Sequence, residues 1–239
     1  MSLPKGRFAH HVHDSLTQLL SRPKPPGKAP LAVFDWDNTC ISGDIGEAVL
    51  ERLDHNGHHP DAVRKYWELC ETYDKTVGYK FCAETMGGMS VQQADDLVND
   101  VIDEHLRSGA ISLRPEMHQL MDRMRDTGWE VWVVTASAEP IVRTFAPRYG
   151  VPRTQVIGMA LHERDGMIQP EMCGPITYRQ GKVDAIDQRI GRRPNFAAGD
   201  ALTDYEMLHT ASDVLLFDRG NEELQLAAKK NGWLVQTPF

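Results

Sequence analysis

Short apolar segments that alternate with helical ones constrain the fold of this 239-residue chain more than any other feature. Strands are indicated at residues 31–34, 130–134, 155–161, 194–198 and 214–217, and most stretches between the later strands have the apolar spacing of helices. Strands that alternate with helices pair in parallel, because each helix carries the chain back to the same end of the sheet. We therefore predict an α/β fold with a doubly wound parallel sheet.

The stretch that follows the first strand departs from this alternation. No strand is indicated between residues 43 and 113, whereas three segments there have helical spacing, at residues 44–53, 61–73 and 91–106. This stretch predicts a helical cap inserted after the first strand, and a proline-rich run separates an N-terminal helix from that strand. The expected division is an N-terminal helix and linker at 1–30, a core domain at 31–42 and 114–239, and a helical cap at 43–113.

Composition excludes several functional classes. No apolar run approaches the roughly 18 residues that a membrane helix needs, so we expect no membrane partner. The formal net charge of −8 would repel a phosphate backbone, so we expect no nucleic-acid partner. The first 20 residues lack an apolar leader, and the four cysteines form no C-x-x-C pair. These features predict a cytoplasmic protein with free thiols.

Polar residues follow three of the predicted strands. Asp35 and Asp37 follow the strand at 31–34, and Thr135 and Ser137 follow the strand at 130–134. Asp200 follows the strand at 194–198, with Asp204 nearby. In a doubly wound sheet, ligands bind beyond the carboxyl ends of the strands. Three acidic groups at one edge repel each other, and Mg²⁺ is the natural counterion for carboxylates that meet a phosphate. The alternative is a turn and helix-cap cluster, which accounts for residues 35–38 alone but not for the companion residues.

Taken together with Lys182, at the start of a predicted helix, these residues resemble the four motifs of phosphatases in the haloacid dehalogenase superfamily. The motifs are Asp35-Trp36-Asp37-Asn38-Thr39, Val133-Val134-Thr135, Lys182 and Gly199-Asp200-Ala201-Leu202-Thr203-Asp204. The insertion between the first and second motifs is similar to that of the branch containing phosphoserine and phosphorylcholine phosphatases. The resemblance covers residues 31–217 and implies a core of that superfamily's fold.

The resemblance also implies a role for each motif. Asp35 would be the nucleophile that forms an aspartyl-phosphate, and Asp37 the general acid and then base. Magnesium would be held by the Asp35 and Asp200 carboxylates and the Asp37 backbone carbonyl, with Asp204 positioning a metal-bound water. The phosphoryl oxygens would be bound by Thr135, the Ala136 amide and Lys182. We therefore expect Mg²⁺-dependent hydrolysis of a small-molecule phosphomonoester.

Substrate choice is expected to depend on the cap. Asp44 lies nine residues after Asp35, where phosphoserine phosphatases have an acidic residue that contacts the substrate ammonium, and Glu47 lies nearly one helical turn later. Asp44 also suits the N-cap of a helix, and both roles are compatible. Five cap aromatics either surround a quaternary ammonium or form the core of the cap: Tyr66, Trp67, Tyr73, Tyr79 and Phe81. These residues favour amine- or choline-bearing substrates such as phosphoserine or phosphorylcholine.

Two alternatives to a hydrolase remain open. A phosphotransferase or phosphomutase would use the same aspartyl-phosphate but pass the phosphoryl group to an acceptor other than water. A non-catalytic module would keep the phosphate site for binding alone, although a decayed enzyme usually loses at least one of the acidic residues or the lysine.

Gly78, Gly87 and Gly88 are candidate hinges for a cap that opens and closes. The sequence does not indicate an oligomeric state.

Overall fold

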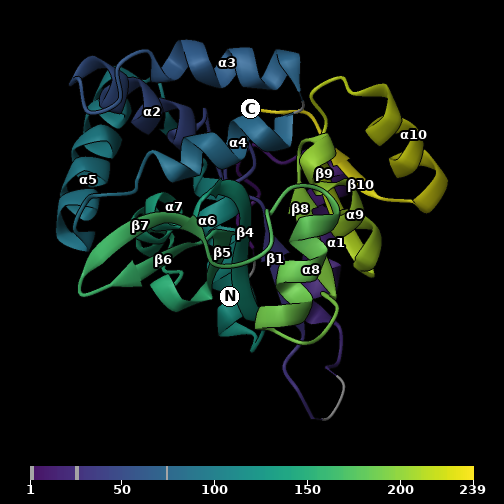
Figure 1. Cartoon of the computed structure of the whole chain (residues 1–239). Coiled ribbons are helices and arrows are strands. Elements are labelled where there is room, and N and C mark those ends of the chain that lie inside the picture. Colours follow the sequence, from purple (N-terminus) through teal and green to yellow (C-terminus); the bar gives the residue numbers. More distant parts are fainter. Residues whose placement is uncertain (1–2, 25–26, 74) are drawn as a thin grey trace.

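A six-stranded parallel sheet forms the centre of the molecule (Figure 1). The computed structural model describes residues 3–24, 27–73 and 75–239, so positions 25 and 26 of the expected linker lie outside the described residues. The strand order is β10-β9-β8-β1-β4-β5. The strands are β1 (Leu31–Phe34), β4 (Glu130–Ala138), β5 (Val156–Met159), β8 (Phe196–Gly199), β9 (Asp213–Phe217) and β10 (Leu234–Gln236).

The strand order confirms a doubly wound sheet. From β1 the chain passes to β4 and β5 on one side, and then returns to β8, β9 and β10 on the other. The connections that leave β1 and β8 therefore diverge, and such a point opens a crevice beyond the carboxyl ends of the strands. The predicted aspartates, which follow β1 and β8, therefore lie at this crevice.

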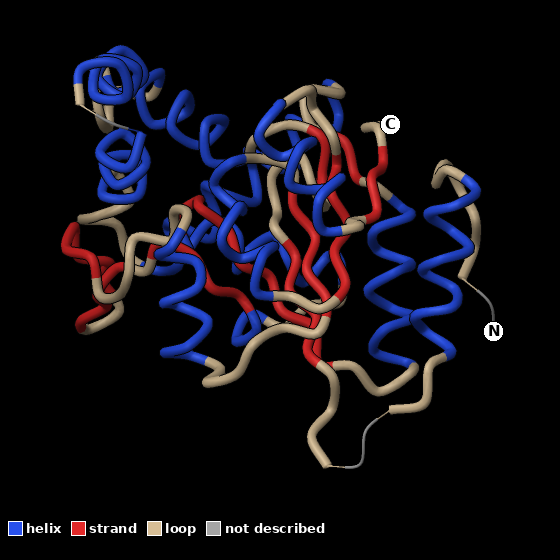
Figure 2. Tube along the Cα trace, turned by 90° about the vertical axis from the view of Figure 1, so that its right-hand side faces the viewer, coloured by secondary structure: helices blue, strands red, loops and turns tan. Residues whose placement is uncertain are grey.

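Both faces of the sheet are covered by helices (Figure 2). Ala32 and Phe34 share a hydrophobic cluster with α1 (His10–Ser21), α6 (Pro115–Asp126) and α7 (Glu139–Phe145). Leu31 and Val33 belong to a second cluster with the helices of the other face, α8 (Gln180–Arg189), α9 (Tyr205–Thr210) and α10 (Glu222–Asn231). Successive residues of a strand point to opposite faces, so a sheet buried on both sides needs the continuous apolar run seen at residues 31–34.

Helices form the insertion between β1 and β4. They are α2 (Ile45–His55), α3 (Ala62–Thr72), α4 (Lys75–Glu84) and α5 (Val91–Ser108), and the short strands β2 (Ile41–Ser42) and β3 (Ser112–Leu113) pair at its base. Helix α4 was not predicted, because Gly78 weakens the helical pattern of its sequence. A Cβ at Gly78 would overlap the Cys70 sulfur, so the glycine allows α4 to approach α3.

A β-hairpin of the core contacts this insertion. The single strand expected at residues 155–161 is instead β5 followed by β6 (Leu161–Arg164), which pairs with β7 (Met167–Met172). The Gly88 amide donates to the Ile168 carbonyl at 2.8 Å, and the Ile168 amide donates to the Met89 carbonyl at 2.8 Å. The hairpin therefore joins the α4–α5 connection to the core through backbone hydrogen bonds.

The remaining described elements are short. Three 3-10 turns occur at Ala146–Tyr149, Arg153–Gln155 and Leu202–Asp204, and the first of them directly follows α7. Strand β10 was not predicted, because it is three residues long and only partly buried. The four cysteines are free thiols, as expected. Among the described helices, none combines the length and apolar character needed to span a bilayer.

Candidate active site

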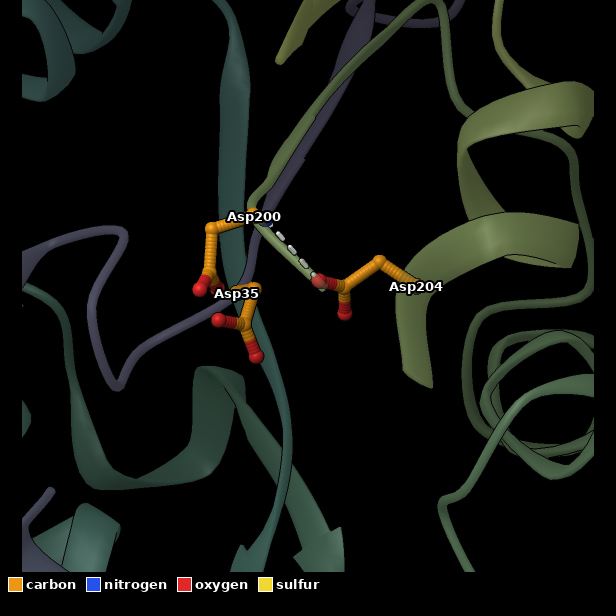
Figure 3. A group of neighbouring side chains, drawn as sticks. All are labelled: Asp35, Asp200 and Asp204. Carbon is orange, nitrogen blue, oxygen red and sulfur yellow. Dashed lines mark hydrogen bonds between the residues drawn. The ribbon is translucent and has the colours of Figure 1, made fainter. Parts of the chain in front are cut away.

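Three carboxylates meet at the carboxyl ends of neighbouring strands (Figure 3). Asp35 follows β1, Asp200 follows β8, and Asp204 ends the 3-10 turn after Asp200. One oxygen of each lies within 4.8 Å of the others, and all three side chains are buried. The Asp35 amide donates to the Ala198 carbonyl at 2.9 Å, so the pairing of β1 with β8 continues to the first aspartate and fixes its position.

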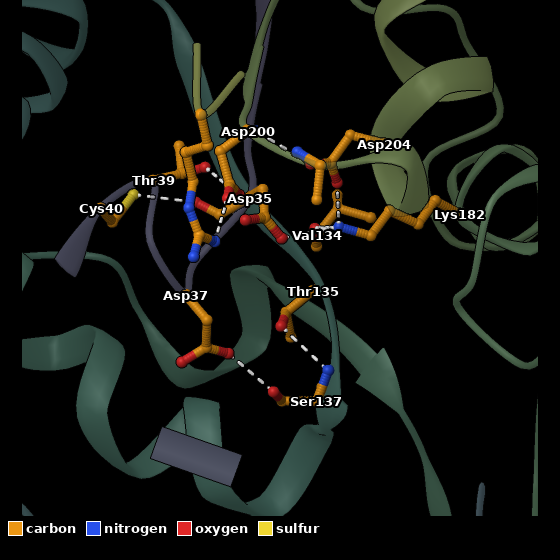
Figure 4. Close-up of polar contacts among 12 residues, drawn as sticks. Asp35, Asp37, Thr39, Cys40, Val134, Thr135, Ser137, Lys182, Asp200 and Asp204 are labelled. Atoms are coloured by element: carbon orange, nitrogen blue, oxygen red, sulfur yellow. Dashed lines mark hydrogen bonds and ion pairs between the residues drawn. The ribbon is translucent and has the colours of Figure 1, made fainter. Parts of the chain in front are cut away.

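Lys182 lies behind these carboxylates and is fully buried (Figure 4). Its Nζ lies 2.7 Å from Asp35 Oδ1, 2.6 Å from Asp204 Oδ1 and 2.8 Å from the Val134 carbonyl oxygen. Burial acts to lower the pKa of Lys182, but the charges of Asp204 and Asp35 outweigh it and raise that pKa. The ammonium is therefore charged, and its three protons have acceptors within the protein.

Asp204 holds the loop that carries Asp200. Its Oδ2 accepts hydrogen bonds from the amides of Asp200 and Ala201, both at 3.1 Å. A Cβ at Gly199 would lie 2.7 Å from the Asp204 carboxylate, so only glycine lets that carboxylate pack against the end of β8. The glycine and the final aspartate of this motif thus form one structural unit.

Each oxygen of Asp200 has a donor of its own. Thr39 Oγ1 donates to Oδ1 at 3.1 Å, and Arg219 Nη1 donates to Oδ2 at 2.8 Å. Burial and the charge of Asp204 raise the pKa of Asp200 to about 6, against the opposing effect of these two donors. Arg219 was not identified from the sequence. The sequence feature that could have identified Arg219 is its position two residues after β9, the strand next to β8. Polar residues at that end of the sheet meet in the crevice.

Asp37 points to a different part of the site. Its Oδ2 accepts from Ser137 Oγ at 2.7 Å (Figure 4). Its Oδ1 accepts from the Ile45 amide at 2.8 Å. Burial, followed by the charge of Asp44, raises the pKa of Asp37 well above its ordinary value, and the two hydrogen bonds oppose this effect. Asp37 therefore holds its proton to a higher pH than an exposed aspartate, and a proton at this carboxyl can be donated to a bound molecule.

The buried carboxylates also fit a hard divalent cation. Burial and the charge of Asp204 raise the pKa of Asp35, while Lys182 acts in the opposite direction. The Lys182 ammonium and the Arg219 guanidinium together offset two of the three clustered carboxylates, which leaves one negative charge unbalanced at a buried place. Carboxylate oxygens are the ligands that Mg²⁺ prefers, and a cation beside Asp35 and Asp200 would complete the charge balance.

A cavity of about 210 Å³ joins these groups to the insertion. Asp44 lies at the N-terminus of α2, where its Oδ1 accepts from the Glu47 amide at 2.9 Å, so it is an N-cap residue and also lines the cavity. Both Asp44 and Glu47 have raised pKa values, because burial disfavours their charged forms. The lining residues are Asp35, Asp37, Asn38, Asp44, Glu47, Tyr79, Thr135, Ala136, Ser137, Asp200, Ala201, Thr203 and Arg219.

The five aromatic residues of the insertion do not act as one group. Tyr79 lines the cavity, and Tyr66 packs behind it with ring centroids 6.0 Å apart. Phe81 packs against the small hydrophobic cluster of the insertion that contains Tyr66. Trp67 and Tyr73 are 49% and 71% exposed, away from the lining residues. Tyr79, on the unpredicted helix α4, is thus the one aromatic ring of the five that meets the cavity.

Sequence comparison identifies relatives with named activities. The family model described as haloacid dehalogenase-like hydrolase matches residues 32–209. A phosphorylcholine phosphatase of Pseudomonas aeruginosa is 25% identical over an alignment that covers 72% of this chain and 68% of that protein. A phosphoserine phosphatase of Mycobacterium tuberculosis is 24% identical, with 90% of this chain and 73% of that protein covered.

Solved structures share the fold. A conserved protein of unknown function from Anaerococcus prevotii superposes with a TM-score of 0.77 at 19% identity, covering 94% of this chain and 91% of that one. A substrate-bound phosphoserine phosphatase superposes with a TM-score of 0.57 at 14% identity, covering 89% of this chain and 95% of that one. At these identities the likeness establishes the α/β fold with its helical insertion.

Proposed function

Because the chain belongs to the haloacid dehalogenase-like hydrolase family, we propose that it is a Mg²⁺-dependent phosphatase that hydrolyses small phosphomonoesters through an aspartyl-phosphate. One observation carries the proposal. Asp35 is buried beside Lys182 and two further carboxylates, while Asp37 lies in the same cavity with a pKa raised by burial. One site therefore offers a nucleophile and a proton donor.

In the first step, an oxygen of Asp35 attacks phosphorus. Lys182 donates a hydrogen bond to Asp35 Oδ1, which leaves Asp35 Oδ2 for the attack. The new O–P bond forms as the ester P–O bond breaks, and the proton of Asp37 passes to the departing alkoxide oxygen. Thr135 and the Ala136 amide bind the phosphoryl oxygens, and Lys182 balances the charge of the nucleophile.

In the second step, water releases phosphate. Asp37, now ionised, accepts a proton from a water molecule, whose oxygen attacks phosphorus as the Asp35–phosphorus bond breaks. The products are inorganic phosphate, free Asp35 and a reprotonated Asp37. The hydrogen bonds from Ile45 and Ser137 hold the Asp37 carboxylate in one orientation through both steps.

Magnesium would be held by the carboxylates of Asp35 and Asp200 with the Asp37 backbone carbonyl. When bound, it supplies positive charge to the phosphoryl oxygens during transfer. Asp204 supports the site through its bonds to Lys182 and to the Asp200 amide.

The leaving group would lie against the cap, residues 43–113. Asp44, Glu47 and Tyr79 line the cavity on this side, so two acidic groups and an aromatic ring face whatever the phosphate is attached to. Carboxylates and aromatic rings bind ammonium groups, including quaternary ones. This supports amine- or choline-bearing substrates, and both relatives named above have such substrates in their names.

The test is phosphate release from a panel of phosphomonoesters, with Mg²⁺ and with a chelator, and with Asp35→Asn in parallel. The expected result is Mg²⁺-dependent release that is highest for an amine- or choline-bearing ester and is absent in Asp35→Asn. No release from any ester by folded protein would contradict a hydrolase. Phosphoryl transfer to an added acceptor would then indicate a transferase or mutase, and ester binding without turnover a binding module.

A further inference from the structure

Arg219 is the cationic side chain that the cavity presents to a bound molecule. It is the only basic residue among the described residues that line the cavity, and half of its side-chain surface is exposed. Lys182, the cation expected from the sequence, has no exposed surface and donates to three protein acceptors. We propose that Arg219 binds an anionic oxygen of the substrate. This inference rests on the proposed phosphatase function.

The contacts of Arg219 fix one part of the guanidinium and leave the rest available. Within the described part of the chain, its one hydrogen bond runs from Nη1 to Asp200 Oδ2, at 2.8 Å. A guanidinium has five N–H donors in a planar fork, and two of them suit the paired oxygens of a carboxylate or phosphoryl group. Asp200 thus anchors the guanidinium while most of its donors have no partner among the described residues.

The surroundings of Arg219 place it between the carboxylate cluster and the cap. Asp200 belongs to that cluster, and Arg219 is also close enough to Asp44 and Glu47 for its charge to act on both. The cavity therefore combines negative side chains with one positive side chain. An anionic oxygen at Arg219 belongs either to the phosphoryl group or to a carboxylate of the leaving group, and the chemistry of recognition is the same for both.

Two substrates separate these sources. Phosphoserine and phosphoethanolamine carry the same phosphate and the same ammonium and differ by one carboxylate. We expect Arg219→Gln to lower kcat/KM by about 10- to 100-fold, the loss that follows removal of a charge-assisted hydrogen-bond pair. A loss confined to phosphoserine assigns the leaving-group carboxylate, and an equal loss on both esters assigns the phosphoryl oxygens. Arg219→Lys, which keeps the charge but not the fork, is expected to recover part of the loss.

The control for charge is Arg193→Gln. Arg193 is also about half exposed and pairs with Asp187, outside the lining of the cavity, so its loss is expected to leave kcat/KM unchanged on both esters. If saturating Mg²⁺ restored kcat/KM of Arg219→Gln to the wild-type value, Arg219 would only orient Asp200 toward the cation. That result, or unchanged kcat/KM on both esters, overturns the inference.

Binding provides a readout that needs no turnover. Calorimetric titration of both esters into Asp35→Asn, and into Asp35→Asn with Arg219→Gln, measures the affinity that Arg219 contributes. Weaker binding of at least one ester in the double variant supports the inference, and equal binding of both overturns it. If wild type releases no phosphate while binding still depends on Arg219, the proposed hydrolase fails and the assignment of Arg219 stands.

Discussion

The two walls of the cavity are built differently. On the core wall, Asp35 and Asp200 line the cavity, and Asp204 and Lys182 lie beneath them. All four side chains are nearly inaccessible, and Lys182 joins Asp35 to Asp204. On the cap wall, Asp44, Glu47 and Tyr79 are only partly buried. The groups proposed for chemistry are thus held by ion pairs and hydrogen bonds to one another, whereas the groups proposed for substrate choice share no ion pair among the described residues.

Asp35→Asn, on the core wall, is expected to cause the largest loss of activity. The amide is a poor nucleophile, so we expect phosphate release to fall by at least about 10⁴-fold, while circular dichroism and thermal melting show a folded protein. On the cap wall, Glu47→Gln is expected to keep turnover within about tenfold on a neutral phosphomonoester, because it removes no reacting group. Turnover retained by Asp35→Asn would remove the nucleophile from the proposed mechanism.

Lys182→Met tests how strongly the core wall holds together. It leaves Asp35 and Asp204 buried without their shared cation, and removing one partner of a buried ion pair costs about 3–5 kcal/mol of unfolding free energy. Denaturant unfolding measures this loss. Arg193→Gln removes an exposed pair and is expected to cost less than about 1 kcal/mol. Equal losses in the two variants would show that the buried network does not stabilise the core wall.

The sequence predicts the core wall better than the cap wall, for a physical reason. Asp35 and Asp200 follow β1 and β8, which pair in parallel with each other, so the topology of the sheet brings the two aspartates to the same edge. Tyr79 reaches the cavity only because α4 approaches α3 across Gly78, a contact that no periodicity indicates.

On the core side, too, the side-chain contacts of Arg219 and Asp37 could not be predicted from the sequence. Arg219 belongs to the site because β9 lies beside β8, and its bond to Asp200 depends on a side-chain direction that the sequence does not give. Asp37 was expected from its spacing, but its bonds to Ile45 and Ser137 depend on how the loop after β1 turns. Periodicity predicts elements and strand ends, and the contacts between elements decide the rest.

Cation binding at the core wall is expected to depend on pH. Because the pKa of Asp200 is raised to about 6, Asp200 is protonated below that pH, and a cation must then displace its proton. We expect Mg²⁺ affinity, measured by calorimetry, to fall about tenfold from pH 7 to pH 5, as the ionised fraction falls. Asp44→Asn, on the cap wall, is expected to leave this profile unchanged. Affinity that stays constant down to pH 5 would contradict a role for Asp200 as a ligand.

Asp44→Asn is expected to give the smallest effect and to act on substrate choice alone. The asparagine oxygen still accepts from the Glu47 amide, so the N-cap of α2 is kept while the charge is removed. We expect KM for phosphorylcholine and phosphoethanolamine to rise about fivefold, because a partly exposed charge pair contributes roughly 1 kcal/mol. KM for an uncharged ester of similar size is expected to stay the same.

Asp44→Ala separates the two roles of this residue. Alanine removes both the charge and the cap, so it is expected to raise KM as Asn does and also to lower the unfolding free energy by about 1 kcal/mol. If Asn changes KM for charged and uncharged esters alike, Asp44 supports the shape of the cavity and not the recognition of an ammonium. The cap wall would then depend on packing as the core wall does, and the contrast between them would lie only in burial.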